Sequence, residues 1–338
     1  MIRAFLAPMA GAAVGLLVGA AIIAASGADP LAAYRGLAEG ALGGPRQLTE
    51  TALKATPLLT VGLGLTVAFR CRVWNIGAEG QYLAGALAGT AVGLLGQASL
   101  PAWVLVPLML AAGLAGGAAW AGLAAWLRLR FGVSEIIATI MLNFVAADAV
   151  SYLTRGPLRE PGSYLPQTAR LEGPARLPTL PGTRLHLGVL LAVLLVPAVH
   201  VLLWRTVRGF RLRAIGAAPG VAAAAGMDVA AGIAFALLCS GALAGLAGVV
   251  EVSAVQGRLK DGAAADYGFA AILVALLGRL HPAGVLVAAF LFAVLTIGAQ
   301  AMHSALGLPV ALSQVLQVGV ILVALVADAL ARRRAAAG

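Results

Sequence analysis

Long apolar runs separated by short polar segments dominate the amino-acid sequence. A helix needs about 20 mostly apolar residues to cross a hydrocarbon core of ~30 Å, because only hydrogen bonds within the helix satisfy its backbone there. The pattern predicts about ten such helices, although 56–69 and 268–280 are short, are interrupted by Gly or Pro and have the form of half-helices or tilted spans. The predicted spans are 4–26, 56–69, 76–95, 102–127, 134–153, 187–204, 229–250, 268–280, 283–303 and 310–330.

The composition agrees with a membrane protein. Hydrophobic residues make up 61% of the chain and charged residues 11%, which excludes an ordinary soluble enzyme and a disordered chain. The net charge of +10 comes from Arg clusters beside the apolar runs, so these residues are expected to anchor helices at the membrane surface rather than bind nucleic acid. We therefore expect residues 1–338 to form one all-α integral membrane domain of about 8–10 spanning helices.

Two polar segments stand apart from the apolar background. Residues 154–186 are rich in Pro and Gly, which predicts a loop in water on the extracytoplasmic side. Residues 205–228 are basic at one end and Ala-rich at the other, and we expect a short helix there on the cytoplasmic surface. The distribution of Arg between the loops favours a multi-pass chain with both termini in the cytoplasm.

Motifs for enzyme chemistry are missing from the sequence. The P-loop pattern G-x-x-x-x-G-K-[ST] does not occur, which excludes ATP binding through a P-loop. The nucleophile elbow G-x-S-x-G is also missing, so nothing in the sequence supports hydrolysis. The four histidines are far apart in sequence and lack metal-ligand spacing. We expect neither a metal nor another cofactor.

A few polar residues within the predicted spans are candidates for a solute path. Asn75 and Glu79 lie where a helix begins, so they either cap that helix or, with Gln81, line a path. Asn143 lies near the middle of its span and either binds a neighbouring helix or faces the path. Asp148 is close to being the only deep acid, and an ionised carboxylate there must face water or a partner.

Gln314 and Gln317 are three residues apart and share a helix face. This face is either a polar stripe along a pore or a set of hydrogen bonds between helices. Glycines also recur at four-residue spacing in several spans, as in Gly85/Gly89/Gly93 and Gly241/Gly245, which predicts close helix packing.

Five segments together carry a resemblance to a known family. They are VWNIGAEGQYLAGALAG at 73–89, SEIIATIMLNFVA at 134–146, YLTRGPLREPGSYLPQT at 152–168, RAIGAAPGVAAAAGM at 213–227 and YGFAAILVALLGRLHPAG at 267–284. In this order they resemble permease subunits of ATP-binding-cassette (ABC) importers of the branched-chain amino acid and simple-sugar superfamily, most closely the nucleoside-importer branch.

The resemblance implies a type II importer permease in the bacterial inner membrane, with a polar solute, lipid and three protein partners. These partners are a cytoplasmic ATPase, a second permease and an extracytoplasmic binding protein. The segment at 213–227 looks like the family's coupling helix, which docks on the ATPase. By that match the coupling residues are Arg213, Gly216, Ala217, Pro219, Ala222, Ala223 and Gly226, with Ala218 departing from the usual polar residue.

Two alternatives stay open from the sequence. An ion-coupled secondary transporter would need a cluster of ionisable groups inside the membrane. An importer for a simple sugar would differ from a nucleoside importer only in its solute, since Asn, Gln, Ser and Thr suit any neutral solute that forms hydrogen bonds. A membrane enzyme is least favoured, because no catalytic constellation is present.

Overall fold

The computed structural model describes residues 14–15, 17–25, 27, 29–263, 266–306, 319 and 326. This described part is built from helices, and its strand-like features are isolated bridges between pairs of residues. The all-α prediction is therefore confirmed for these residues. The chain divides into two compact units, one of Met1–Ala55 with Val287–Gly338 and one of Thr56–Leu286.

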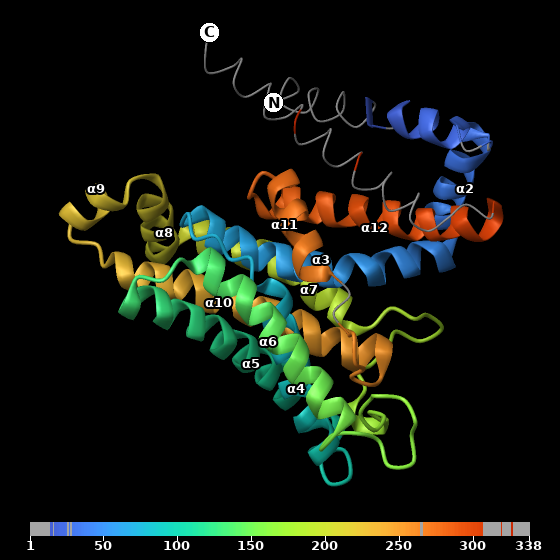
Figure 1. Cartoon of the computed structure of the whole chain (residues 1–338), viewed down its shortest axis with the longest axis horizontal. Helices are drawn as coiled ribbons and strands as arrows, with labels where there is room; N and C mark the ends of the chain where they lie inside the picture. Colours follow the sequence, from blue (N-terminus) through green and yellow to red (C-terminus); the bar gives the residue numbers. More distant parts are fainter. Residues whose placement is uncertain are drawn as a thin grey trace. The chain divides into compact units, whose positions relative to one another are not determined.

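Figure 1 shows the helices in chain order. They are α2 (Pro30–Leu42), α3 (Pro45–Arg70), α4 (Ala78–Gly96), α5 (Ala102–Phe131), α6 (Glu135–Arg155), the 3-10 turn η1 (Gly173–Ala175), α7 (Leu187–Arg205), α8 (Val207–Ala217), α9 (Pro219–Ala224), α10 (Val229–Glu251), the π-helical turn η2 (Val252–Gln256), α11 (Tyr267–Leu277) and α12 (Pro282–Leu306).

Six helices of the described part are long and apolar enough to cross a membrane, namely α3, α5, α6, α7, α10 with η2, and α12. A seventh crossing arises if the bent pair Leu17–Ala25 and α2 forms one span. Most of the predicted span 310–330 and part of 4–26 lie outside the described residues. A multi-pass membrane protein follows, whereas the described helices do not establish the predicted count of about ten.

Helix α3 corrects one prediction. The expected span 56–69 was short, but α3 is a continuous helix of 26 residues that begins at Pro45 and contains Pro57. Its first half carries Arg46, Glu50 and Lys54, which lower the hydropathy yet are good helix formers. Helix α11 has 11 residues and matches the expected short element.

The larger unit is organised around α4, α5 and α10, which pack side by side (Figure 1). A Cβ on Gly85 would lie 2.1 Å from the Cα of Gly245, and a Cβ on Gly117 would lie 2.1 Å from the carbonyl oxygen of Gly241. These backbones therefore touch at glycines, as the four-residue spacing predicts. In the smaller unit, a Cβ on Gly40 would lie 2.1 Å from the Cβ of Ala301, so α2 and α12 approach equally closely.

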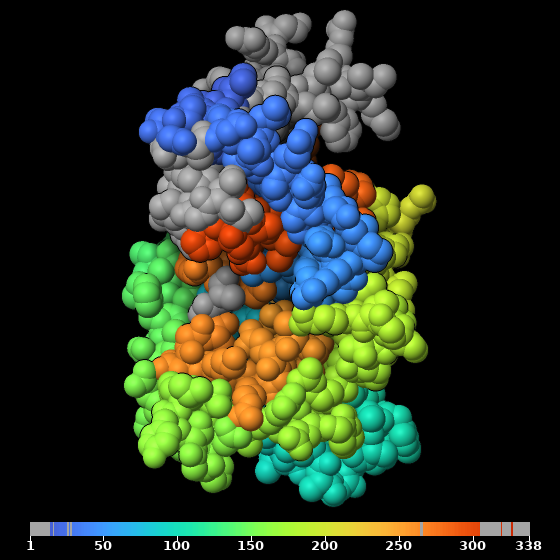
Figure 2. Space-filling model, turned by 90° about the vertical axis from the view of Figure 1, so that its right-hand side faces the viewer, coloured from blue at the N-terminus to red at the C-terminus, as the bar shows by residue number. Residues whose placement is uncertain are grey.

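The loop after α6 (156–186) packs against the segment that follows η2 (257–263), and these two segments together form what we call the platform. Figure 2 shows the loop, in yellow-green, against this segment, in orange. Leu171 donates its backbone N–H to the carbonyl of Gly257 at 2.8 Å, and Arg155 pairs with Asp261. The loop therefore has few helical residues but a defined backbone.

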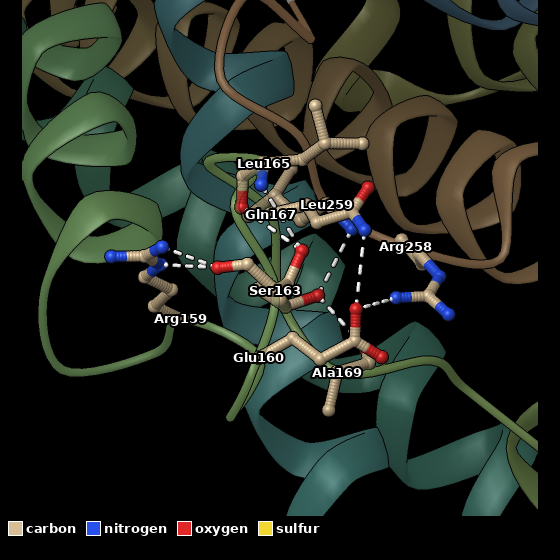
Figure 3. Close-up of polar contacts among 9 residues, drawn as sticks. Arg159, Glu160, Ser163, Leu165, Gln167, Ala169, Arg258 and Leu259 are labelled. Atoms are coloured by element: carbon tan, nitrogen blue, oxygen red, sulfur yellow. Dashed lines mark hydrogen bonds and ion pairs between the residues drawn. The ribbon is translucent and has the colours of Figure 1, made fainter.

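Figure 3 shows the centre of this platform. The backbone N–H of Thr168 donates to the Leu259 carbonyl at 2.9 Å, and the Thr168 hydroxyl accepts from the Leu259 N–H at 3.1 Å. Glu160 pairs with Arg258 and accepts from the Gln167 amide at 3.1 Å. These contacts tie two segments almost 100 residues apart in sequence.

Candidate functional site

A non-helical segment separates α3 from α4, and its polar groups are satisfied by side chains. The Asn75 amide donates to Gln81 Oε1 at 2.8 Å and to Ser240 Oγ at 2.9 Å. Its oxygen accepts from the Gly77 N–H at 3.0 Å and from the Gln81 amide at 2.9 Å. Asn75 therefore caps the turn that leads into α4, and its side chain is buried.

Helix α6 holds the same segment from the other side. Asn143 accepts from the Gly80 N–H at 2.8 Å and donates to the Ile76 carbonyl at 3.0 Å. The Thr139 hydroxyl accepts from the Ile76 N–H at 3.2 Å. Asn143 thus replaces backbone hydrogen bonds that a continuous helix would have made, which backbone at membrane depth requires.

These contacts place the start of α4 at the middle of the bundle. Ser240 is near the midpoint of α10, and Asn143 is near the midpoint of α6. The predicted path residues Asn75, Gln81 and Asn143 therefore come together, and all are buried. Their hydrogen bonds favour the capping and interhelical roles in this conformation, and a role in the path is a proposal.

Glu79 lies beside this cluster and joins α4 to α11. Its Oε2 accepts from the backbone N–H of Gly268 at 2.5 Å. A Cβ on Gly268 would lie 2.3 Å from the Glu79 nitrogen, so the two helix starts touch. In the turn that follows α11, the Leu280 carbonyl accepts from Arg70 Nε at 2.9 Å, so the far end of α11 lies at the end of α3.

The predicted coupling residues divide into two groups. Gly216 and Ala222 are buried and Arg213 is half-buried, so they hold the segment on the bundle. Ala217, Pro219, Ala223 and Gly226 are exposed on α8, α9 and the following turn. Figure 1 shows α8 and α9 together at one end of the helix group. The exposed residues can therefore contact a partner.

Gly216 and Arg213 attach the segment at two points. A Cβ on Gly216 would lie 2.1 Å from the Arg70 carbonyl oxygen, so only glycine permits this approach to the end of α3. Arg213 Nε donates to the Leu203 carbonyl at 3.0 Å. Arg70 and Arg213 also lie near the Trp204 ring, with their Cζ atoms 5.1 and 6.0 Å from its centroid.

The histidines are less isolated than the sequence indicates. The rings of His200 and His281 contact each other with centroids 5.4 Å apart, and both contact Trp204. Within the described residues, however, no group of three or more His, Cys, Asp or Glu side chains could hold a metal ion. The three rings therefore support packing between α7 and the turn before α12.

The acidic residues inside the bundle are not the one expected from the sequence, which was Asp148. Asp148 is exposed on α6, whereas Glu79 and Glu251 are buried. Asp148 is therefore not the only acid within the helices, because the fold buries acids that lie near helix ends in the sequence. Gln314 and Gln317 lie outside the described residues. Sequence reasoning also missed Tyr82 and Arg70. The available signals were an aromatic residue near the start of α4 and an Arg at the end of α3.

Comparison with known proteins gives the family. The family model described as "Branched-chain amino acid transport system / permease component" matches residues 47–325. The chain belongs to this permease family. This permease is thus an ABC transporter subunit without an ATPase site of its own, as the five sequence segments predict.

Three relatives are similar along most of their length. The permease is 39% identical to the glucose ABC transporter permease protein TsgB13 of Haloferax volcanii, over 94% of this chain and 86% of that protein. It is 35% identical to the guanosine ABC transporter permease protein NupP of Bacillus subtilis, over 90% and 88%. It is 31% identical to the nucleoside ABC transporter permease protein NupB of Lactococcus lactis, over 89% and 85%. No solved structure gives a significant match.

Proposed function

We propose that this permease forms the membrane path of an ATP-driven importer for nucleosides. The observation that carries the proposal is the coupling segment, in which buried residues attach α8 and α9 to the bundle and exposed residues remain available to a separate ATPase. The relatives named for guanosine and nucleosides support the solute class. The relative named for glucose favours a simple sugar as the second candidate.

The proposed assembly contains four kinds of subunit. A cytoplasmic ATPase contacts the exposed residues of α8 and α9, and a second permease completes the path. An extracytoplasmic binding protein delivers the solute to the loop 154–186, which belongs to the platform. We place the assembly in the bacterial inner membrane. The full permease would have about ten spans in a type II arrangement, with the described helices supplemented by the ends of the chain.

The proposed path runs past the polar residues at the middle of the bundle. Asn75, Glu79, Gln81 and Asn143 are the predicted residues that support it, together with Gln314 and Gln317. Because most of these side chains bind one another in the described conformation, solute passage requires that α4 move relative to α6 or α10. Movement between 1:99 and 99:1 populations needs about 5.5 kcal/mol of bias, which ATP binding by the partner would supply.

The coupling role is tested by a charge on the exposed face of α9. We expect Ala223→Glu to lower ATP-dependent guanosine uptake by more than about tenfold, because a carboxylate without a partner at a docked interface costs over ~1.4 kcal/mol. Uptake by the complete importer in proteoliposomes measures the effect, and thermal melting checks that the permease is still folded. Ala98→Glu, at an exposed residue in the turn after α4, is the matched control. Equal uptake by the two variants would remove the coupling role.

A further inference from the structure

Helices α4 and α11 begin at the same point and run apart. Glu79 is in the first turn of α4, and it binds the backbone of Gly268 in the first turn of α11. The start of α4 also contacts the middle of α6 through Asn143. Two helix N-termini, each with a partial positive charge, therefore meet inside the bundle.

Two polar atoms at this junction are buried and have no hydrogen-bond partner in the described part of the chain. They are Oε1 of Glu79 and the hydroxyl of Tyr82. The exposed fraction is 4% for Glu79 and 1% for Tyr82. A buried polar group without a partner costs about 1–3 kcal/mol, so two of them on residues three positions apart in one helix need an explanation.

Glu79 and Tyr82 both contact the start of α11. Because Glu79 Oε2 is bound to the Gly268 N–H, its unpartnered Oε1 lies at the same helix start. The Tyr82 ring contacts the ring of Tyr267, the first residue of α11, with centroids 5.8 Å apart. Glu79 and Tyr82 are also three residues apart on α4, which puts both on one face with about 5–6 Å between their Cβ atoms.

We propose that this junction is a binding site for a pair of adjacent hydroxyl groups on the solute. One solute hydroxyl donates to Glu79 Oε1, and the neighbouring one accepts from the Tyr82 hydroxyl. The positive ends of α4 and α11 hold the carboxylate in place, so it binds a neutral hydroxyl without needing a cationic partner. This inference rests on the proposed function, because a ribose and a hexose both carry adjacent hydroxyls.

Discontinuous helices that meet at membrane depth are a recurrent way to build a solute site in transporters. Here the site is closed in the described conformation, since Tyr82 is buried and the helix starts touch. The solute therefore reaches Glu79 and Tyr82 only when α4 and α11 separate. When α4 and α11 separate, Glu79 Oε1 and the Tyr82 hydroxyl are exposed together. The solute therefore binds to the conformation in which these two helices are apart.

Tyr82→Phe is the decisive variant, because it removes one hydroxyl and keeps the ring. The complete importer in proteoliposomes is supplied with guanosine and with 2',3'-dideoxyguanosine, and in a second arm with glucose and with 2,4-dideoxyglucose, which has no two hydroxyls on neighbouring carbons. We expect Tyr82→Phe to lower kcat/KM about five- to tenfold for guanosine or glucose, the value of one neutral hydrogen bond, and less than about twofold for the deoxy analogue. The binding protein is the same throughout, so its selectivity cancels in the variant-to-wild-type ratio.

Tyr152→Phe is the matched control, because Tyr152 is 70% exposed on α6. Glu79→Gln is also expected to reduce the preference for the hydroxylated solute, because its one oxygen is needed to accept from the Gly268 N–H and its NH2 group cannot accept from the solute. Equal losses for a solute and its deoxy analogue, or no loss for either, would overturn the site and leave Tyr82 as a packing residue. Absence of ATP-driven uptake by the wild-type importer would instead refute the proposed function, and the site with it.

Discussion

At the residue scale, His186 shows how burial alone affects a titratable group. It lies directly before α7, is buried, and neither ring nitrogen has a hydrogen-bond partner among the described residues. Burial lowers the pKa of His186 to about 4, because the interior disfavours the charged imidazolium. The unfolded chain has an ordinary pKa of about 6.5, so it binds the proton first as the pH falls.

We therefore predict that acidification destabilises the folded platform. Between pH 7 and pH 5 the lowered pKa of His186 costs about 2 kcal/mol of unfolding free energy, and the loss continues until the pH reaches about 4. Thermal unfolding in detergent at several pH values measures it. His186→Gln should show a shallower fall of melting temperature between pH 7 and pH 5. Parallel pH profiles for the two proteins would contradict the assignment.

Arg70 and Gly216 show a second kind of residue effect, in which one position serves two neighbours. The Arg70 side chain donates to the Leu280 carbonyl, and its own carbonyl lies against Gly216. Arg279 and Leu280 both have positive φ, at 55° and 53°, which is strained for residues with side chains. Arg70 therefore ties the coupling segment and a strained turn to the end of α3.

We predict that Arg70→Gln uncouples without unfolding the bundle. The glutamine is too short to reach the Leu280 carbonyl, so the turn between α11 and α12 loosens. ATP hydrolysis by the complete importer should persist, while guanosine uptake per ATP falls about fivefold, in line with the loss of a charged hydrogen bond of roughly 1.5 kcal/mol or less. An unchanged ratio of uptake to hydrolysis would show that this contact does not transmit movement.

At the element scale, the contact of α4, α5 and α10 depends on missing side chains. A Cβ on Gly245 would lie 2.2 Å from the Gly113 carbonyl oxygen and 2.8 Å from the Gly117 Cα. Neither neighbour is a flexible side chain, so the helices themselves would have to separate. In lipid, where apolar surface gives little drive for helix association, such close backbone contact is a main source of stability.

Gly245→Ala should consequently destabilise the bundle by about 1–3 kcal/mol through overpacking. The midpoint of thermal unfolding in detergent reports the change. Gly36→Ala is the control, because a Cβ on Gly36 in α2 meets no atom within 4 Å. That control should be neutral or slightly stabilising, since Ala favours a helix. A similar melting temperature for both variants would count against the close packing.

The same elements show what sequence reasoning can reach. The bounds of α5, α6, α7 and α10 are within a few residues of the predicted spans, because long apolar runs between Arg, Gly and Pro mark both ends. The length of α3 was missed because its first half is polar. The junction of Glu79 with Gly268 joins residues 189 positions apart, and a single sequence contains no signal for such a pairing.

At the scale of the whole molecule, the permease belongs to a transporter whose ATPase is a separate subunit, and the path and the docking segment are the parts that we propose for this chain. The contacts of the platform, of the junction between α4 and α11 and of the coupling segment all lie in the unit of Thr56–Leu286. The sequence predicted the docking segment and the polar residues, whereas it did not predict which of them face inwards. Ala222 and Ala223 are neighbours of the same type, and only the fold buries one and exposes the other.

We predict that the chain alone accumulates no solute under an ion gradient. Purified permease in liposomes with an imposed sodium or pH difference should leave guanosine and glucose at equal concentration inside and outside. The complete importer, with ATP on the side of the membrane that carries the ATPase, should concentrate guanosine or glucose. Accumulation by the permease alone would favour the ion-coupled alternative, for which buried Glu79 and Glu251 would then be the first residues to replace.

The hydrogen bonds around Asn75 also have a consequence for biosynthesis. The Asn75 side chain binds Ser240, which follows it by 165 residues, and the Ile76 and Gly80 backbones bind α6, which begins about 60 residues later. While the ribosome makes the intervening chain, these polar groups have no native partner, and lipid cannot provide one. The native hydrogen bonds of this segment therefore form only after α6 and then α10 have been translated, so the turn at Asn75 is completed late in synthesis even though its own residues are made early.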